Sequence, residues 1–484
     1  MKSTSIFGGV QLFQIVISII RSKFIAVLLG PMGMGVSGLL TSTIGLVQML
    51  TSFGLGTSAV RDVSAAFASG NATRLFIVVT VFRRIMWVTG LLGAIITLIS
   101  SPWLSELTFG NRDYSSAFML ISMTLLLNQI SVGQGVLLRG TRQINSIARS
   151  GIIGSFLGLF TTIPLYYFWG IKGIVPGIII SAVTSLVVSW YYSREIEILP
   201  IYVSKARTIA EGRDMIKIGF FIGLNGLIVT VSSYVVRVFI NSAGNIDDVG
   251  LYNAGFAIVT TYVGLVFTAM STDYYPVLSA AAHSNKLCRN LINQQAEVAL
   301  LIITPIILVF LVFINWIVIL LYSSKFAPIN DMILYAAMGM LFKSVSWSIA
   351  FVFLAKGDSK LFFWSELISS TYVLVLNILG YKLYGLTGMG ISFMVGYIIY
   401  LVQVFIVSKV KYGFHFERSF SEVFYPQLVI ATICLVVVKF TSNPYSYVLG
   451  ILLIIISLWI SYKGLDKRIG FRSLVNKYIK AKYN

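Results

Sequence analysis

The stretch that decides the fold is QLFQIVISIIRSKFIAVLLGPMGMGVSGLLTSTIGLVQ, which runs from Gln11 to Gln48. It holds two apolar runs, each close to the roughly 20 residues needed to cross the hydrocarbon layer of a bilayer. Between them lies a glycine-rich segment that contains Pro31, and both residue types interrupt helices. The stretch therefore predicts two membrane-spanning helices joined by a hinge.

The first of these helices carries a polar stripe formed by Gln11, Gln14, Ser18 and Arg21. Their spacing of three or four residues places them on one helix face. An arginine deep in a bilayer costs at least roughly 2.5–3.5 kcal/mol, and its guanidinium stays charged. We therefore expect Arg21 to face protein or a water-filled cavity. The alternative is that Arg21 extends toward the outer interface, as long basic side chains do near helix ends.

Composition defines the class of protein. Of the 484 residues, 57% are hydrophobic and only 11% are charged, which excludes an ordinary soluble domain of this size. The chain is predicted to be an all-α polytopic membrane protein with about 14 transmembrane helices. They are expected near residues 6–29, 36–58, 75–100, 115–138, 150–169, 173–192, 216–240, 249–272, 298–322, 331–354, 361–384, 386–408, 422–440 and 446–462.

The net charge of +19 raises the alternative of nucleic-acid binding, but the basic residues are distributed as in a membrane protein. With the expected helices, most Lys and Arg fall on one side of the membrane. The exceptions are Arg112, Lys172, Lys325, Lys382 and Lys439 on the other side, and Arg21, Lys23, Arg237 and Lys343 within helices. Basic loops face the cytoplasm, so both termini are predicted to be cytoplasmic and no nucleic-acid partner is expected.

The helix pattern repeats along the chain. A shift of 215 residues superposes Gly35 on Gly250, and a shift of 216 places Arg21 on Arg237. Such a repeat predicts two six-helix lobes related by a pseudo-twofold axis along the membrane normal. The expected domains are an N-lobe at 1–193, a cytoplasmic linker at 194–216, a C-lobe at 217–409, a loop and two additional helices at 410–462, and a basic cytoplasmic tail at 463–484.

The seventh predicted helix repeats the chemistry of the first, with a stripe of Gly226, Thr230, Ser233 and Arg237. Lys343 lies near the middle of the tenth helix, where extension to an interface is harder. We therefore predict a shared cationic site formed by Arg21, Arg237 and Lys343. Its cavity is expected to be lined by Gln14, Ser18, Gln48, Asn128, Thr230, Ser233 and Asn253.

Acidic residues within the expected helices are few. Glu366, near the cytoplasmic end of its helix, is the candidate for coupling to H+ or Na+, although it could instead pair with a neighbouring base. Glu297, beside the loop after the eighth helix, is expected to be solvated.

No pattern in the sequence points to an enzyme. It contains no nucleotide-binding P-loop, no metal-ligand cluster and no nucleophile beside a base. The two cysteines, Cys288 and Cys434, form neither a metal motif nor a disulfide framework. We therefore predict a transporter without catalytic residues, metal or cofactor, driven by an ion gradient or by substrate supply.

The motif LLGPMGMGVSGL at residues 28–39 resembles the start of Wzx-type polysaccharide (O-antigen) flippases, which belong to the multidrug/oligosaccharidyl-lipid/polysaccharide exporter superfamily. The motif WGIKGIVPG at Trp169–Gly177, its echo YGLTGMGIS at Tyr384–Ser392 and the basic tail extend the resemblance along the chain. The resemblance implies a bacterial inner-membrane protein that works by alternating access. Its substrate would be an undecaprenyl-pyrophosphate-linked oligosaccharide, O-antigen or a similar repeat unit, moved from the cytoplasmic to the periplasmic leaflet.

The resemblance also implies a cationic central cavity, which Arg21, Arg237 and Lys343 would form around the pyrophosphate. The expected partners are the lipid-linked oligosaccharide, anionic membrane lipids and the polysaccharide polymerase machinery. Two alternatives within the superfamily stay open. A lipid II flippase is one, because its members also carry two helices beyond twelve, and a cation-coupled multidrug exporter is the other.

Reporter fusions after residues 32, 110, 245 and 327 should all report the periplasm, because each position falls on the side with few basic residues. Alkaline phosphatase, active only in the periplasm, and a fluorescent protein that matures only in the cytoplasm give the two readouts. A cytoplasmic signal at residue 245 would contradict the two-lobe plan.

Overall fold

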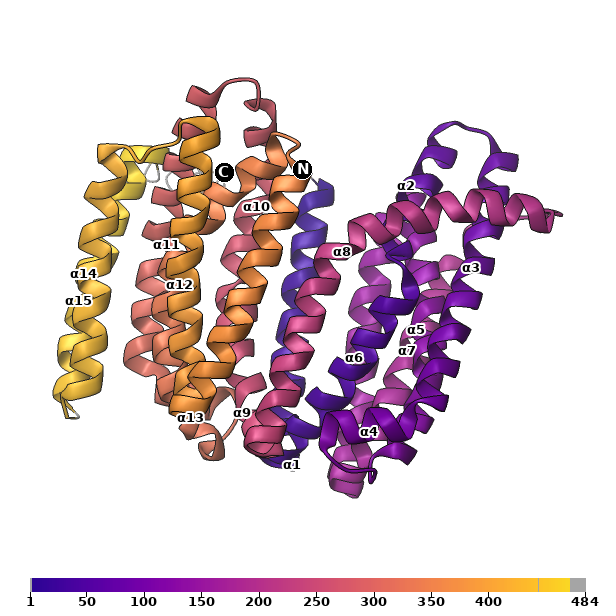
Figure 1. Ribbon diagram of the computed structural model, residues 1–484, viewed down its shortest axis with the longest axis horizontal. Helices are drawn as coiled ribbons and strands as arrows, with labels where there is room; N and C mark the ends of the chain where they lie inside the picture. Colours follow the sequence, from indigo (N-terminus) through magenta and orange to yellow (C-terminus); the bar gives the residue numbers. More distant parts are fainter. Residues whose placement is uncertain (1, 443, 471–484) are drawn as a thin grey trace, which may run out of the picture. The chain divides into compact units, whose positions relative to one another are not determined.

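The computed structural model describes residues 2–442 and 444–470 (Figure 1). Its regular secondary structure within these residues is entirely helical, and eleven helical runs there are long and apolar enough to cross a membrane. Three of the eleven are each divided in two, at Gly30, at Gly170 and at Gly385, so the fourteen expected segments are all present. The prediction of an all-α polytopic membrane protein is confirmed.

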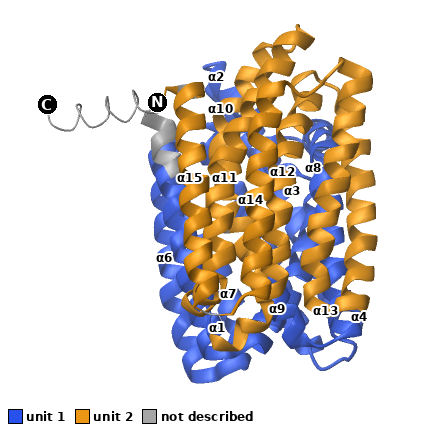
Figure 2. Cartoon of the chain, turned by 90° about the vertical axis from the view of Figure 1, so that its left-hand side faces the viewer, with its two compact units in different colours: residues 1–253, 321–323 blue, residues 254–320, 324–484 orange. Residues whose placement is uncertain are grey.

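The chain forms two compact units, which Figure 2 shows in different colours. Unit 1 comprises residues 1–253 and 321–323, and unit 2 comprises residues 254–320 and the chain from 324 onward. The helices of unit 1 are α1 (Lys2–Ser52), α2 (Leu55–Ala68), α3 (Ala72–Ile99), α4 (Ser101–Phe109), α5 (Ser115–Gly140), α6 (Ile144–Trp169), the short η1 (Gly170–Gly173), α7 (Ile174–Ser193), α8 (Lys205–Ala243) and most of α9 (Ile246–Phe256). Those of unit 2 are the π-helix η2 (Ala257–Val263), α10 (Leu265–Ala280), α11 (Asn285–Leu321), the short η3 (Ser324–Ile329), α12 (Asn330–Ala355), α13 (Ser359–Tyr412), α14 (Arg418–Phe440) and α15 (Tyr445–Ile469).

Glycines with positive φ make the breaks inside the long helices. Gly30 has φ 67° directly before Pro31, so the expected hinge in α1 is present. Gly170 and Gly385 adopt nearly the same backbone, with φ/ψ of 54°/−134° and 55°/−137°. The shift of 215 residues equates these two glycines, so their shared conformation supports the internal repeat.

A second pair of glycines equated by the repeat lies at a helix crossing within unit 1. The second half of α1 meets α9 at Gly35 and Gly250. A Cβ on Gly35 would overlap the carbonyl oxygen of Ile246, and a Cβ on Gly250 would overlap that of Pro31. Only glycine allows this backbone-to-backbone approach, which makes the crossing sensitive to any side chain.

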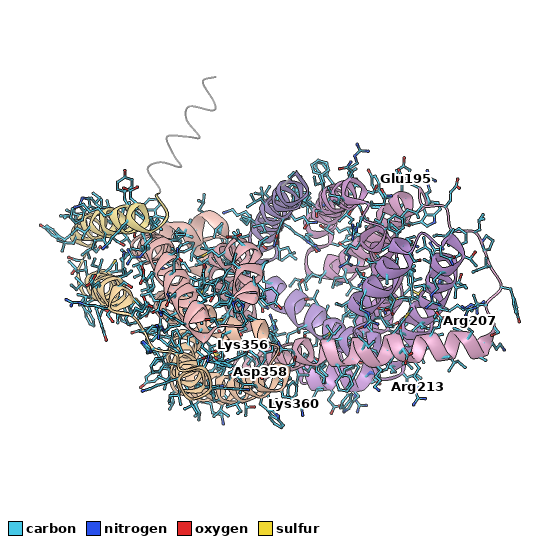
Figure 3. All side chains as sticks on the ribbon, turned by 90° about the horizontal axis from the view of Figure 1, so that it is seen from above. Glu195, Arg207, Arg213, Lys356, Asp358 and Lys360 are labelled. Carbon is cyan, nitrogen blue, oxygen red and sulfur yellow. The ribbon has the colours of Figure 1, made fainter. Side chains whose placement is uncertain are left out.

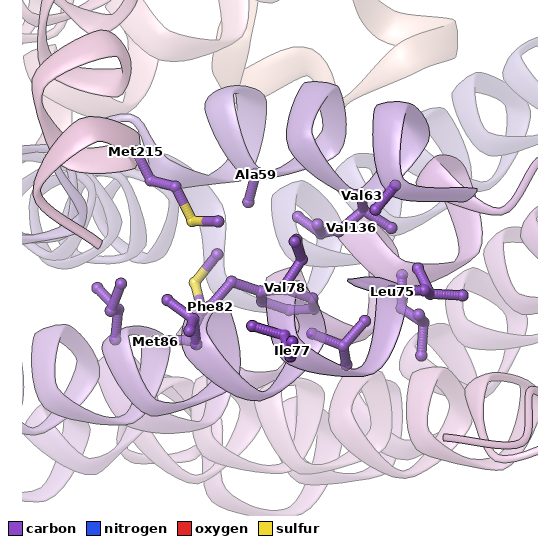
Figure 4. Packing of buried hydrophobic residues seen from close by; sticks show 14 of the residues in the cluster. Ala59, Val63, Leu75, Ile77, Val78, Phe82, Met86, Val136 and Met215 are labelled. Atoms are coloured by element: carbon purple, nitrogen blue, oxygen red, sulfur yellow. The ribbon is translucent and has the colours of Figure 1, made fainter. Parts of the chain in front are cut away.

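The segment after α1 differs from the expectation of a span ending near 58 and an inner loop. α1 ends at Ser52, Gly54 turns the chain in the left-handed conformation, and residues 55–68 form α2. One face of α2, with Leu55, Ala59 and Val63, is buried in a hydrophobic cluster with α3 and α5 (Figure 4). This apolar face, repeated at four-residue spacing, is what makes the segment a packed helix.

The expected linker at 194–216 is partly helical, because α8 begins at Lys205. Ser204 caps it by accepting a hydrogen bond from the backbone N–H of Arg207 at 3.3 Å. Met215 inserts into the same hydrophobic cluster, and Glu211 pairs with Arg74 of α3 at 2.6 Å. Figure 3 shows Arg207 along this first part of α8.

The rest of α8, expected to open the second lobe, also packs within unit 1. Gly219 lies so close to the turn at Gly54 that a Cβ on Gly54 would overlap the Gly219 carbonyl, and a Cβ on Gly219 would overlap that of Phe53. Further along, Tyr234 Oη lies 2.8 Å from Thr108 Oγ1, and Asn241 Nδ2 donates to the Thr108 carbonyl at 3.0 Å. α8 therefore belongs to the first compact unit, while the lobe limits 1–193 and 217–409 stay a prediction.

In unit 2, α12 packs against α13 through Gly390, where a Cβ would overlap the Met332 carbonyl. The turn between these helices is held by Asp358, which accepts hydrogen bonds from Tyr412 and, at 2.9 Å, from Lys411 (Figure 3). The hydrogen bond from Tyr412, and after it the one from Lys411, lowers the pKa of the Asp358 carboxyl. The carboxylate therefore stays charged and keeps the turn closed at neutral pH.

The last two helices are anchored to the rest of unit 2 by a buried ion pair. Arg468 of α15 donates to Glu297 of α11, and Glu297 is only 4% exposed. The expectation that Glu297 is solvated is wrong, because Arg468, which is distant in the sequence, packs against it in the structure. Residues 463–469 of the predicted basic tail continue α15, and residues 471–484 lie outside the described residues.

Glu297→Ala should lower the free energy of unfolding by about 3–5 kcal/mol, because it leaves the Arg468 guanidinium buried without its carboxylate. Thermal unfolding of the purified protein in detergent measures the loss. Glu422→Ala, which breaks the exposed pair with Arg418, is the matched control and should change the melting temperature little. Equal effects of the two substitutions would contradict the anchoring role.

Candidate functional site

A cavity of about 680 Å³ lies within unit 1, between α1, α5, α6 and α7. The structure places Gln14 and Arg21 of the predicted stripe in its wall, together with Gln11. The other polar side chains of the wall are Ser131, Arg139, Ser150, Ser155, Ser181, Ser185 and Ser189. Four helices of unit 1 thus surround a space with a partly polar wall.

Small residues leave room for this cavity. On α6, Gly151, Gly154 and Gly158 line the wall at helical spacing, so that at these three positions only backbone borders the space. Opposite, the hydroxyl of Ser131 on α5 lies 3.1 Å from those of Ser185 and Ser189 on α7. The hydroxyls therefore hold α5 and α7 together and still present polar atoms to the cavity.

Two guanidinium groups give the cavity a positive charge. Arg21 is half-buried and forms no hydrogen bond or ion pair within the part of the chain that the structure describes. Arg139 donates from Nε to the Gly135 carbonyl at 3.1 Å, which leaves its terminal nitrogens available. Since no Asp or Glu is among the described residues of the wall, the cavity is suited to an anion.

Arg237, the repeat partner of Arg21, is held by protein groups instead. Its Nε donates to Asn253 Oδ1 at 2.8 Å, and its Nη1 donates to the carbonyl and the hydroxyl of Ser233. The ring of Tyr252 lies 6.0 Å from the guanidinium carbon. The structure thus brings three predicted site residues, Arg237, Ser233 and Asn253, into one hydrogen-bonded group.

The repeat explains why only one of the two arginines is held in this way. The shift of 215 residues that superposes Gly35 on Gly250 equates Asn253 with Gly38, and the shift of 216 that superposes the two arginines equates it with Ser37, so neither shift offers Arg21 an amide side chain. The two positions also meet, since a Cβ on Gly38 would overlap the Asn253 amide. Arg21 therefore lacks the amide partner of Arg237 and keeps its donors for another ligand.

Lys343 and Glu366 lie in unit 2. Lys343 is half-buried, with its ammonium 5.2 Å from the ring of Tyr397, 5.7 Å from Phe267 and 5.9 Å from Phe393. Aromatic faces stabilise a cation at these distances. Glu366 accepts a hydrogen bond from Tyr400 Oη at 2.6 Å, rather than pairing with a base.

The remaining predicted residues take other places. Ser18 is exposed on α1, Gln48 and Asn128 are half-buried on α1 and α5, and Thr230 donates to its own helix at the Gly226 carbonyl. None of these four is among the described residues that line the unit 1 cavity.

Sequence reasoning missed Arg139 and the cavity serines. Arg139 falls one residue beyond the helix expected at 115–138, whereas in the structure it lies in the last turn of α5. The signal that could have revealed them is that α5, α6 and α7 each carry a stripe of small residues. It was missed because such stripes usually mark close helix packing. Only the positions of α5, α6 and α7 distinguish a packed seam from a cavity wall.

Comparisons with known proteins place the chain among polysaccharide biosynthesis proteins. A family model described as "Polysaccharide biosynthesis protein" matches residues 24–331. The lipid III flippase of Escherichia coli (strain K12) is 20% identical over 396 residues, which cover 80% of this chain and 93% of that protein. A putative O-antigen transporter of Shigella flexneri is 23% identical over 380 residues, covering 76% and 88%.

Two solved structures share the fold. A lipid II flippase in an inward closed conformation superposes with a TM-score of 0.72, 14% identity and coverage of 97% of this chain and 99% of that chain. A multidrug resistance transporter in an inward-facing conformation gives a TM-score of 0.69 with 13% identity, covering 84% and 98%. At these identities the likeness concerns the fold.

Proposed function

Because the chain belongs to the polysaccharide biosynthesis protein family, we propose that it is a flippase for a lipid-linked oligosaccharide. The substrate is an undecaprenyl-pyrophosphate-linked repeat unit of O-antigen type, which the protein carries from the cytoplasmic to the periplasmic leaflet of the bacterial inner membrane by alternating access. The observation that carries this proposal is the cavity with Arg21 and Arg139 in its wall. The polymerase machinery of the same polysaccharide is the partner that would consume the translocated product.

The chemistry of the wall fits both parts of such a headgroup. Pyrophosphate is a multiply charged anion, and guanidinium groups bind its oxygens through paired charge-assisted hydrogen bonds. Serine hydroxyls and the Gln14 amide can both donate to and accept from the hydroxyls of a sugar. A cationic drug would meet two positive charges without a carboxylate among the described wall residues, which disfavours the multidrug exporter. Lipid II and lipid III carry the same pyrophosphate and stay as alternatives.

Deletion of the gene should abolish surface polysaccharide and leave resistance to cationic dyes unchanged. Gel electrophoresis of the surface polysaccharide and dye growth inhibition give the two readouts, and complementation with the wild-type gene is the control. Normal polysaccharide with lost dye resistance would overturn the flippase and favour the exporter.

Within that assay, Arg21→Ala and Arg139→Ala should each weaken substrate binding by roughly tenfold to a hundredfold, the effect of losing about 1.5–3 kcal/mol of charged hydrogen bonding. Arg→Lys should recover only part of the activity, because lysine keeps the charge but loses the paired donors. Surface polysaccharide is compared at matched membrane abundance. Full activity of both lysine variants would instead mean that the arginines extend to an interface.

Arg237→Ala and Lys343→Ala test the predicted shared site of Arg21, Arg237 and Lys343. If these residues bind the pyrophosphate together, each substitution should lower the amount of surface polysaccharide. If Arg237 acts through its hydrogen-bonded group, Asn253→Ala should reproduce the effect of Arg237→Ala. Wild-type activity in both Arg21→Ala and Arg237→Ala would exclude the shared site of Arg21, Arg237 and Lys343.

We also propose that Glu366 couples transport to H+ or Na+, because its carboxylate lies within α13 against Tyr400. Glu366→Gln should abolish the dependence of transport on an ion gradient while leaving substrate binding intact. Transport into vesicles, with a proton or a sodium gradient imposed in turn, measures this. An unchanged gradient dependence would exclude the residue.

A further inference from the structure

A second hollow lies within unit 1, separate from the cavity around Arg21. It is a groove of about 1120 Å³ between α3, α5, α7 and the chain that follows α7. Its apolar lining consists of Trp87, Met123, Leu126, Leu127, Ile130, Leu186, Val187, Trp190, Ile196, Ile198 and Leu199. Several of these side chains are more than half exposed, among them Met123 and Val187, so the groove is open rather than filled by protein.

The groove has the length of one lipid chain. Met123 and Gln134 line it eleven residues apart on α5, which is about 16 Å at the rise of an α-helix. One leaflet contributes about half of a hydrocarbon layer of roughly 30 Å. An acyl chain lying along α5 would therefore be in contact with the groove over the depth of one leaflet.

The charged groups of the groove are Arg194 and Glu197, where α7 ends and the chain toward α8 begins, and Arg83, whose neighbour Arg84 donates to the Val203 carbonyl of that chain at 2.8 Å. Arg83 of α3 is half-buried and forms no hydrogen bond or ion pair with any described residue. Arg194 lies with its guanidinium carbon 4.5 Å from the ring of Tyr191 and 5.3 Å from that of Trp190. Glu197 is the single acidic residue among the described lining residues.

Arg83 therefore presents a permanent charge without a protein partner next to an apolar surface. Such a charge is stabilised by an anion, and a phosphate diester is the anion that lipids bring to this depth. Two arginines against one glutamate leave one net positive charge, which matches the single negative charge of phosphatidylglycerol. The glycerol hydroxyls of that headgroup can donate to Glu197.

We propose that this groove is a binding site for one molecule of phosphatidylglycerol. Its phosphate binds Arg83 and Arg194, and one acyl chain lies along α5 between Trp87 and Trp190. The site holds a resident lipid of the leaflet at this end of unit 1, and it is independent of the flippase substrate.

The two groove tryptophans allow a direct test. The full chain is reconstituted in phosphatidylcholine nanodiscs that contain increasing fractions of phosphatidylglycerol brominated on its acyl chains, which quenches nearby tryptophan fluorescence. Quenching should saturate at a low fraction and should be strongly reduced in a Trp87→Phe, Trp190→Phe variant. Arg83→Gln and Arg194→Gln should each raise the half-saturating fraction by about tenfold, the effect of losing one charge-assisted hydrogen bond.

The matched control is Arg149→Gln, which removes the same charge from an exposed position of α6 outside the groove and should leave the curve unchanged. Arg194 is exposed, so Arg194→Gln is expected to fold even if Arg83→Gln does not. Three outcomes would overturn the proposal. They are equal quenching by brominated phosphatidylethanolamine, an equal shift in Arg149→Gln, and release of quenching by equimolar undecaprenyl pyrophosphate, which would assign the groove to the substrate's own lipid.

Discussion

An arginine inside a membrane protein keeps its charge, and this one constraint connects the main features of unit 1. Each guanidinium at membrane depth needs a hydrogen-bonding partner, water or an anion. Arg237 is held by Asn253 and Ser233. Arg21 has no such group and lies instead in a cavity lined by serine and glutamine. The same side chain thus lies in two surroundings, one a hydrogen-bonded group of protein atoms and the other a polar cavity.

The internal repeat and its departures explain how the two settings arose from one plan. Glycines related by the repeat adopt the same backbone at 170 and 385, and they face each other at 35 and 250. Close backbone crossings of this kind tolerate no side chain, so the glycines fix the helix geometry. At the next related pair the repeat departs, with Gly38 in one place and Asn253 in the other. Arg21 therefore has no amide at the place that corresponds to Asn253.

Several features that depend on contacts between distant residues could not be predicted. α2 and the start of α8 were expected in connections, but each has an apolar face that packs in one hydrophobic cluster. Glu297 was expected in solvent, but Arg468 from the end of the described chain pairs with it. Serines and glycines on α5, α6 and α7 were not among the residues expected to line a cavity, and they surround one. In each case the residue's environment is set by a neighbour that is remote in sequence.

The sequence by itself determined the helical class, the fourteen membrane segments, the hinge at Gly30 and the polar stripe on α1. These follow from local properties, because hydrophobic length, helical spacing and the conformational needs of glycine and proline act within about 20 residues. Only the tertiary structure decided which polar residues share a site. It added Arg139 to Arg21, joined Arg237 to Asn253, and placed Lys343 among aromatic rings. The physical reason is that a cavity is a space left between helices, and its walls are defined by how those helices pack rather than by any one of them.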